Sequence, residues 1–112
     1  MGDLEFEGEF LNGNRWNGKL KVYNLVSELD YEITYINGKR SGKGTEYYDE
    51  GKIKFEGEYL NGNRKKGKEY YYDGKLKFEG DYLNGEKWNG KENVYNQGKL
   101  LYEIKYLNGT KK

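Results

Sequence analysis

With 112 residues, the chain is long enough for one domain, and its 20 Lys and Arg residues nearly balance its 19 Asp and Glu residues, which leaves a net charge of +1. This balance argues against the broad basic surface that duplex nucleic acid requires and against strong general attraction to an anionic membrane. Because the chain has neither cysteine nor histidine, disulfide bonds, thiolate or zinc sites and histidine-based catalysis are excluded.

Hydrophobic residues make up only 34% of the chain, and 13 of its residues are tyrosines. The near-zero net charge and the aromatic content of 17% nevertheless oppose disorder. A thin array in which each unit packs on its neighbours fits this composition better than a thick core. No apolar run reaches the roughly 20 residues of a membrane span, and no signal peptide is expected. We therefore expect a cytoplasmic protein, either free or associated with a membrane or the cytoskeleton.

The first segment, residues 4–11, alternates apolar and acidic residues and ends at Asn12-Gly13, a pair that favours the tight turn of a β-hairpin. The segment recurs along the chain, with Asn-Gly pairs beginning at residues 12, 37, 61, 84 and 108 and spacings of 25, 24, 23 and 24. A fixed period of this length is typical of a repeat array. No stretch has the apolar period of a helix, and the chain has no proline.

These signals predict four full hairpins and one half hairpin in a single domain, residues 1–112. The units span about residues 4–28, 29–52, 53–75 and 76–99, followed by a half unit at 100–109 and a polar tail at 110–112. Leading strands are expected at 4–11, 31–36, 55–60, 78–83 and 100–107, and return strands at 19–23, 45–48, 68–72 and 92–95. The predicted fold class is all-β: an elongated, twisted antiparallel β-meander that forms one open sheet.

Side-chain alternation places the rings of the leading strands on one face of this sheet. The aromatic row consists of Phe6, Phe10, Tyr31, Tyr35, Phe55, Tyr59, Phe78, Tyr82, Tyr102 and Tyr106. The residue between the two rings of a unit is Gly8, Ile33, Gly57, Gly80 or Ile104. A glycine at this position leaves room for a ring to lie over the backbone.

The opposite face carries acidic residues such as Glu56, which we expect to be solvated or faced by lysine. If the turn consists of Asn-Gly alone, Phe55 pairs with Lys68 and shares its face with Tyr70 and Tyr72. A β-bulge after the turn would reverse these faces, so this assignment depends on the register.

The pattern aromatic-Glu-Gly-Glu-aromatic-x-Asn-Gly-x-x-x-x-Gly-Lys-x-Tyr, repeated every 23 to 25 residues, resembles the MORN repeat (membrane occupation and recognition nexus). Residues 55–75 match it almost completely, residues 37–45 match its loop, and the resemblance covers residues 4 to about 109. Ile33 and Ile104 depart from the pattern by replacing its glycine. The resemblance implies a sheet of successive hairpins and a scaffolding role in protein interaction, dimerisation or phospholipid binding.

We interpret the chain as a non-catalytic scaffold that binds a peptide or helix of a protein partner on its aromatic face, because a thin sheet leaves part of that face exposed. The candidate partner-binding residues are Phe10, Tyr31, Tyr35, Phe55, Tyr59, Phe78, Tyr82 and Tyr106. Unpaired strands at the two ends, especially residues 100–107, could also join a second copy into a homodimer. Trp16 and Trp88 hold equivalent positions and are either packing anchors or exposed contacts.

The alternative is a peripheral module that binds anionic phospholipid through basic loops. Its candidate residues are Lys39, Arg40, Lys43, Arg64, Lys65 and Lys66. Binding of this kind would weaken steeply with salt, whereas binding to an aromatic groove would not. A carbohydrate-binding array is a further alternative, and the near-zero charge disfavours binding of single-stranded nucleic acid.

No catalytic, cofactor or metal site is predicted. Glu56 and Glu79 could be drawn as an acid–base pair, but equivalent acids recur in each unit, which is typical of a solvated face. Residues 42–45, Gly-Lys-Gly-Thr, lack the upstream glycine and the following helix of a phosphate-binding loop.

Overall fold

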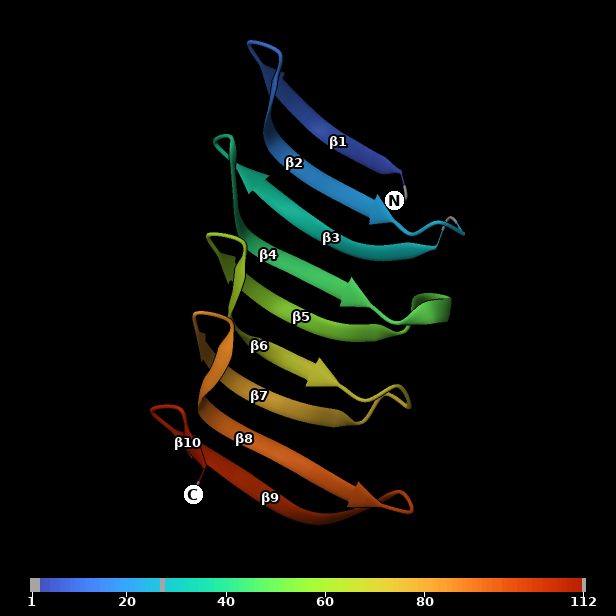
Figure 1. The fold of residues 1–112 in the computed structure, drawn as a ribbon. Helices are drawn as coiled ribbons and strands as arrows, with labels where there is room; N and C mark the ends of the chain where they lie inside the picture. The colour runs from blue at the N-terminus through green and yellow to red at the C-terminus, as the bar shows by residue number, and fades with distance from the viewer. Residues whose placement is uncertain (1–2, 27, 112) are drawn as a thin grey trace.

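A computed structural model describes residues 3–26 and 28–111 and shows ten strands hydrogen-bonded in sequence order into one antiparallel sheet (Figure 1). The strands are β1 (Leu4–Leu11), β2 (Asn14–Tyr23), β3 (Leu29–Ile36), β4 (Lys39–Tyr47), β5 (Ile53–Leu60), β6 (Asn63–Tyr70), β7 (Leu76–Leu83), β8 (Glu86–Asn96), β9 (Lys99–Leu107) and β10 (Thr110–Lys111), with a short 3-10 turn, η1 (Asp49–Gly51), between β4 and β5. The predicted fold class is confirmed: the sheet is open, is built from successive hairpins and measures 51 × 32 × 19 Å. None of the described segments is a helix long and apolar enough to cross a membrane.

Each hairpin closes through an Asn-Gly pair with both residues at positive φ, as the sequence predicts. In the third hairpin, Asn61 has a φ of 52° and Gly62 a φ of 83°. The twist of this turn matches the right-handed twist of the flanking strands. Glycine adopts the backbone without steric cost, and asparagine is among the residues that tolerate it. All these turns lie along one side of the sheet, which we call the Asn-Gly edge (Figure 1).

A register shift follows each of the first four Asn-Gly turns. In the third hairpin, Tyr59 pairs with Arg64 and Glu58 pairs with Lys66, so Lys65 is the extra residue of a β-bulge. The return strands begin directly after the turns. The segments predicted as inner loops therefore belong to β2, β4, β6 and β8.

The bulge decides between the two face assignments that the sequence left open for the third return strand. Phe55 pairs with Glu69 rather than with Lys68. Tyr70 consequently lies on the opposite face, where its hydroxyl donates to Glu56 Oε1 at 2.7 Å. The physical reason is that one extra residue in a strand of period two exchanges its two faces.

The face opposite the aromatic row sets acidic residues against lysines. The pairs across β1–β2, β5–β6 and β7–β8 include Glu7 with Lys19, Glu56 with Lys68 and Glu79 with Lys91. These acidic side chains are exposed or half-buried, so the expectation of a solvated face balanced by lysine is confirmed. Exposed pairs of this kind contribute little individually to stability.

The core of the sheet is the aromatic row packed against its own backbone. Phe55 and Phe78 are 0% exposed although the described strands form a single sheet. The edge of the Phe55 ring lies over Gly57 and Gly67, since a Cβ atom on either glycine would lie 3.0 or 2.8 Å from Phe55 Cζ. The expectation that glycine leaves room for a ring is confirmed at this position.

The two ends of the sheet differ. Within the described residues, β1 is unpaired along its outer side, whereas Thr110 and Lys111 of β10 pair with Leu107 and Tyr106 of β9. Two residues of the predicted polar tail thus extend the sheet, because the fifth Asn-Gly turn also folds the chain back. Lys112 lies outside the described residues.

Replacing Gly57 by alanine should destabilise the protein by about 3 kcal/mol, the upper end of the usual cost of overpacking. The added Cβ would lie 2.2 Å from the Lys66 carbonyl oxygen and 2.7 Å from Gly67 Cα. Gly62→Ala is the matched control, because its Cβ meets nothing within 4 Å and costs only the left-handed backbone, about 1 kcal/mol. Urea unfolding measures both losses, and equal losses would contradict this account of the core.

Candidate binding face

Rings of successive hairpins interlock on the aromatic face. The first ring of one hairpin meets the second ring of the next hairpin edge to face. The pairs are Phe6–Tyr35, Phe55–Tyr82 and Phe78–Tyr106, each with ring centroids 5.7 Å apart. Among the described side chains, no such pair joins Tyr31 to Tyr59, where the period requires one. The ring ladder is therefore broken between the second and third hairpins.

The break has a cause in the sequence. Ile33 occupies the position at which the third hairpin has Gly57, and its side chain is 7% exposed. The Tyr59 ring lies over Gly44, the partner of Ile33, since a Cβ atom on Gly44 would lie 2.6 Å from Tyr59 Cε1. Ile33 and Tyr59 thus occupy the space that the Phe55 ring takes over Gly57 and Gly67 in the third hairpin. Tyr31 instead packs at the margin of the core and stays partly exposed. One departure from the repeat pattern thus opens the aromatic face.

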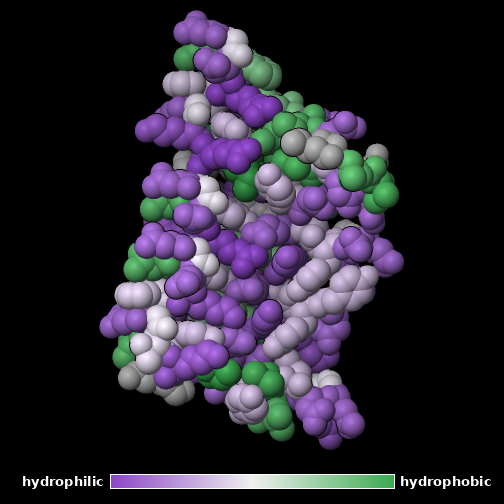
Figure 2. All heavy atoms as spheres, viewed as in Figure 1, coloured by the Kyte–Doolittle hydropathy of each residue, from purple (hydrophilic) through white to green (hydrophobic). Residues whose placement is uncertain are grey.

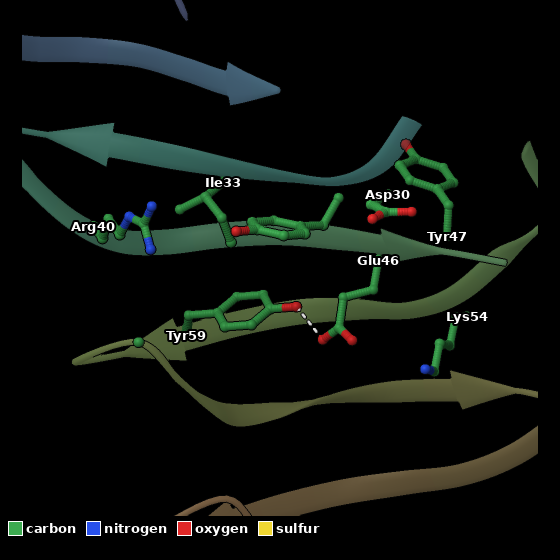
Figure 3. Close-up of a pocket in the computed structure, with 9 residues that line it drawn as sticks. Asp30, Ile33, Arg40, Glu46, Tyr47, Lys54 and Tyr59 are labelled. Carbon is green, nitrogen blue, oxygen red and sulfur yellow. Dashed lines mark hydrogen bonds between the residues drawn. The ribbon is translucent and has the colours of Figure 1, made fainter. Parts of the chain in front are cut away.

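A pocket of about 430 Å³ lies at the break (Figure 3). Its floor contains the buried side chains of Ile33 and Tyr59, and Tyr31 lines one side. Charged residues of both signs also line it, namely Asp30, Glu46, Arg40 and Lys54. The volume falls within the range of about 300–1,000 Å³ that ligand pockets have.

Arg64 fixes the acidic wall of this pocket from β6. Its Nε and Nη2 donate to the two carboxylate oxygens of Glu46 at 2.9 and 2.8 Å, and its Nη1 lies 3.4 Å from Glu69 Oε1. Its Cζ also lies 4.4 Å from the centroid of the Phe55 ring. One arginine therefore links neighbouring hairpins and covers a core ring.

Tyrosine hydroxyls complete a charged ladder along the face. The donor–acceptor pairs are Tyr59 to Glu46 at 2.5 Å, Tyr82 to Glu69 at 2.5 Å and Tyr106 to Glu92 at 2.9 Å. In the fourth hairpin, Lys87 takes the place of arginine and lies 2.8 Å from Glu92 Oε1. The same three roles, tyrosine donor, acidic acceptor and basic clamp, thus recur from the second hairpin onward.

The charged ladder shifts the pKa values of its tyrosines and of Glu46 in opposite directions. Burial and the bonded carboxylates raise the pKa of Tyr59 and Tyr82 far above the usual value, and that of Tyr106 to about 12. Burial alone would raise the pKa of Glu46, but hydrogen bonds from Arg64 and Tyr59 outweigh it and lower that pKa. At neutral pH Glu46 is therefore ionised, and Tyr59, Tyr82 and Tyr106 are protonated.

The structure places five of the predicted partner-binding residues where a partner can reach them at least in part. Tyr31 and Tyr59 line the pocket. Phe10, which is 59% exposed, and Tyr35 line a second depression of about 770 Å³ between the first two Asn-Gly turns. Tyr106 lies at the margin of the core. The five therefore divide among separate places on the face.

The other three predicted residues, Phe55, Phe78 and Tyr82, are buried. Arg64 covers Phe55, and Lys87 lies over Phe78 with its Nζ 5.2 Å from the ring centroid. These three rings hold the sheet together and present no surface to a partner in this structure. The sequence does not reveal this, because exposed and buried rings have the same spacing.

The predicted basic loop residues lie on β4 and β6 rather than in loops. Lys39, Arg40, Lys43, Lys65 and Lys66 are exposed. Arg64 is half-buried and bound to two carboxylates, so it is not available as a loop contact. The bulge register, which decides which residues face the core, could not be read from the sequence.

The two tryptophans are packing anchors. A Cβ atom on Gly38 would lie 3.2 Å from the Trp16 ring, and one on Gly109 would lie 3.0 Å from the Trp88 ring. The Gly38 and Gly109 N–H groups also donate to the Trp16 and Trp88 carbonyl oxygens at 2.9 and 2.8 Å. Each indole thus supports the Asn-Gly turn of the next hairpin.

Sequence reasoning missed an apolar row along the Asn-Gly edge. One aliphatic residue precedes the Asn-Gly pair of each of the five turns, and all five are 46–54% exposed: Leu11, Ile36, Leu60, Leu83 and Leu107. Hydrophobic atoms appear along this edge in Figure 2. The sequence does show an aliphatic residue at the position directly before the Asn-Gly pair of each turn. Alternation alone, however, does not show which aliphatic residues stay exposed.

The hairpins, ring pairs and charged ladder define an open-sheet β-hairpin repeat protein. Comparison of the chain with protein families, with curated proteins and with solved structures gives no match. In the part of the chain that the structure describes, no group of three or more His, Cys, Asp or Glu residues is placed to hold a metal ion.

Replacing Arg64 by alanine should lower the free energy of unfolding by about 2 kcal/mol at neutral pH, because two half-buried carboxylates lose their cation. Lys65→Ala is the matched control on the exposed bulge and should change it by less than about 0.5 kcal/mol.

The effect of Arg64→Ala should also depend on pH. The pKa of Glu46 is lowered in the folded chain, so its contribution is complete above the unfolded value of about 4.3 and is lost as the pH falls through the folded value. Urea unfolding should show the difference from wild type shrinking below about pH 4. A difference that stays constant down to low pH would contradict the charged ladder.

Proposed function

We propose that this chain is a non-catalytic binding module and that the pocket at the break in the ring ladder receives an apolar or aromatic side chain from a protein partner. The observation that carries the proposal is the interruption itself. At the junctions that follow the third and fourth hairpins, a Phe ring packs on a Tyr ring of the next hairpin. At the junction between the second and third hairpins, an open pocket with an apolar floor takes the place of this ring pair. Apolar surface with a polar rim is typical of interaction sites.

The rim supports a peptide segment as the ligand. Arg40 lies at one end of the pocket, and Asp30 and Lys54 lie at the other (Figure 3). A segment crossing the pocket would therefore meet charges on both sides of its anchor side chain. Such charges give register and specificity, while the buried anchor supplies most of the affinity.

The state of the acidic wall supports a binding role over acid–base catalysis. Glu46 accepts hydrogen bonds from Arg64 and Tyr59, and its pKa is lowered rather than raised. A carboxylate used as a general acid would need the opposite shift. Glu46 instead serves as a fixed negative wall.

Self-association through the ends of the sheet is part of the proposal and agrees with the resemblance to MORN repeats. β1 offers an unpaired strand within the described residues, and β9 offers one from Lys99 to Lys105. A second copy added at either end would extend the sheet by strand pairing.

A variant that closes the pocket tests the proposal. The double change Tyr31→Phe with Ile33→Gly restores the ring-over-glycine arrangement of the third and fourth hairpins. Peptides selected from a displayed random library for binding to wild type should bind this variant at least tenfold more weakly, because their anchor side chain loses its pocket.

Tyr102→Ser is the control for the loss of an exposed ring elsewhere, since Tyr102 is 51% exposed and lies on β9. It should leave peptide affinity unchanged. Circular dichroism checks that all variants keep their strand content. If the selected peptides bind the closed variant and wild type with equal affinity, the proposal is rejected.

The apolar row on the Asn-Gly edge favours a second candidate function, peripheral binding to anionic phospholipid. Exposed Lys39 follows directly on the second of these turns, and exposed Lys65 lies three residues after Gly62 of the third, so aliphatic and basic groups lie near the same edge. Aliphatic insertion together with basic contacts to headgroups is the usual basis of peripheral membrane binding.

Co-sedimentation with vesicles that contain phosphatidylserine tests this second candidate. Binding should fall by at least tenfold for Leu60→Ser with Leu83→Ser, and high salt should weaken what remains. The closed-pocket variant serves as the control and should sediment like wild type. No sedimentation at low salt would reject membrane binding through this edge.

A further inference from the structure

The first hairpin departs from the charged ladder at one position. The return-strand residue opposite the first ring is acidic in the second, third and fourth hairpins: Glu46, Glu69 and Glu92. In the first hairpin, Phe6 is paired with Leu20 instead, and this leucine is 0% exposed. The junction between the first and second hairpins therefore lacks the carboxylate that each later junction has.

The donors that would bind this carboxylate are nevertheless present. Arg15 Nη1 and Arg40 Nε both donate to Tyr35 Oη, at 3.4 and 3.1 Å. Arg15, Arg40 and Tyr35 correspond by position to the clamp and tyrosine of the later hairpins, since Arg15 pairs with Phe10 and Arg40 pairs with Tyr35. The junction thus keeps two guanidinium groups and a phenol, but no acid between them.

No charge within contact distance neutralises this group among the described residues. Neither Arg15 nor Arg40 has an acidic oxygen within 4.0 Å in the described part of the chain, and the Tyr35 O–H has no acceptor there. Asp30 and Glu46 line the same pocket as Arg40, but Glu46 is bound to Arg64.

The group is accessible from solvent. Arg40 is exposed and lines the 430 Å³ pocket, while Arg15 and Tyr35 are half-buried and line the 770 Å³ depression. Lys39 lines that depression as well and adds a third positive charge nearby. A ligand can therefore reach Tyr35 from the side of the pocket or from the side of the depression.

We propose that Arg15, Tyr35 and Arg40 form a binding site for one carboxylate group, which takes the role that Glu46, Glu69 and Glu92 have at the later junctions. The Tyr35 hydroxyl donates to the carboxylate, and the two guanidinium groups form charge-assisted hydrogen bonds to it. The site shares Arg40 with the proposed peptide pocket but does not rest on it, because Arg15 and Tyr35 lie outside that pocket.

The titration of Tyr35 agrees with this assignment. Burial raises its pKa, but the hydrogen bonds from Arg40 and Arg15 outweigh burial, and the pKa is lowered. The pKa of Tyr59, Tyr82 and Tyr106 shifts in the opposite direction, because burial raises it and the carboxylate bound to each raises it further. Tyr35 thus lies in an electropositive place that is open to an anion.

Titration with sodium glutarate, followed by NMR of the arginine Nε–H groups, tests the site directly. The Arg15 and Arg40 signals should shift and saturate, while Arg64, already bound to Glu46, serves as an internal reference and should not move. Sodium chloride at equal ionic strength controls for screening. Shifts with inorganic phosphate but not with glutarate, or equal shifts with chloride, would overturn the carboxylate assignment.

The source of the carboxylate is distinguished by comparing glutarate with a short peptide that contains one glutamate and with the same peptide containing glutamine. Glutamate peptide that binds at least tenfold more tightly than glutarate assigns the site to an acidic side chain of a partner. Equal affinity assigns it to a free carboxylate. Failure of glutarate and glutamate peptide alike rejects the site.

Two kinds of variant complete the test. Leu20→Glu supplies the missing acid from within the chain and should abolish glutarate binding, whereas Leu20→Gln, of matched size, should not. Arg15→Gln should weaken glutarate binding at least tenfold yet leave the peptide pocket intact. It therefore separates this site from the proposed function and remains informative if Leu20→Glu fails to fold. Unchanged glutarate binding in Arg15→Gln would refute the site.

Discussion

The constraint on which this structure depends is that a single sheet must cover its own aromatic face. No second layer of described residues packs on it, so rings can be buried only against the backbone and against each other. Glycines opposite one another, such as Gly57 and Gly67, let the Phe55 ring approach the backbone closely. Dispersion and the removal of ring surface from water then stabilise a sheet that is only 34% hydrophobic in composition.

The charged ladder covers what the rings leave open. Arg64 stacks on Phe55 while it binds Glu46 and Glu69, and the tyrosine hydroxyls donate to the same acids. A half-buried acid without these donors would be costly, and a ring without the arginine would be exposed. Each part of the ladder therefore depends on its neighbours in the adjoining hairpins, as in other repeat proteins.

A binding site is expected where the rings and the charged ladder leave the aromatic face uncovered. Ile33 prevents one ring from covering the backbone and leaves a pocket, and Leu20 removes one acid and leaves two arginines and a tyrosine without it. Both departures lie near the second hairpin, whereas the third and fourth hairpins follow the pattern closely. Departures from a strict repeat are thus better guides to a site here than the repeated residues themselves, because the repeated residues are used to build the sheet.

The sequence by itself determined the hairpin array, the turns and the aromatic row, because Asn-Gly pairs and period-two alternation are local signals that the backbone must obey. Ile33 was also visible as an exception, although its consequence for Tyr31 was not. Only the tertiary structure decided the rest: the bulge at Lys65, the burial of Phe55 and Phe78, and the role of Arg64 as a clamp rather than a loop cation. The physical reason is that one extra residue in a strand exchanges its faces, and pairing between strands, not local preference, sets where that residue lies.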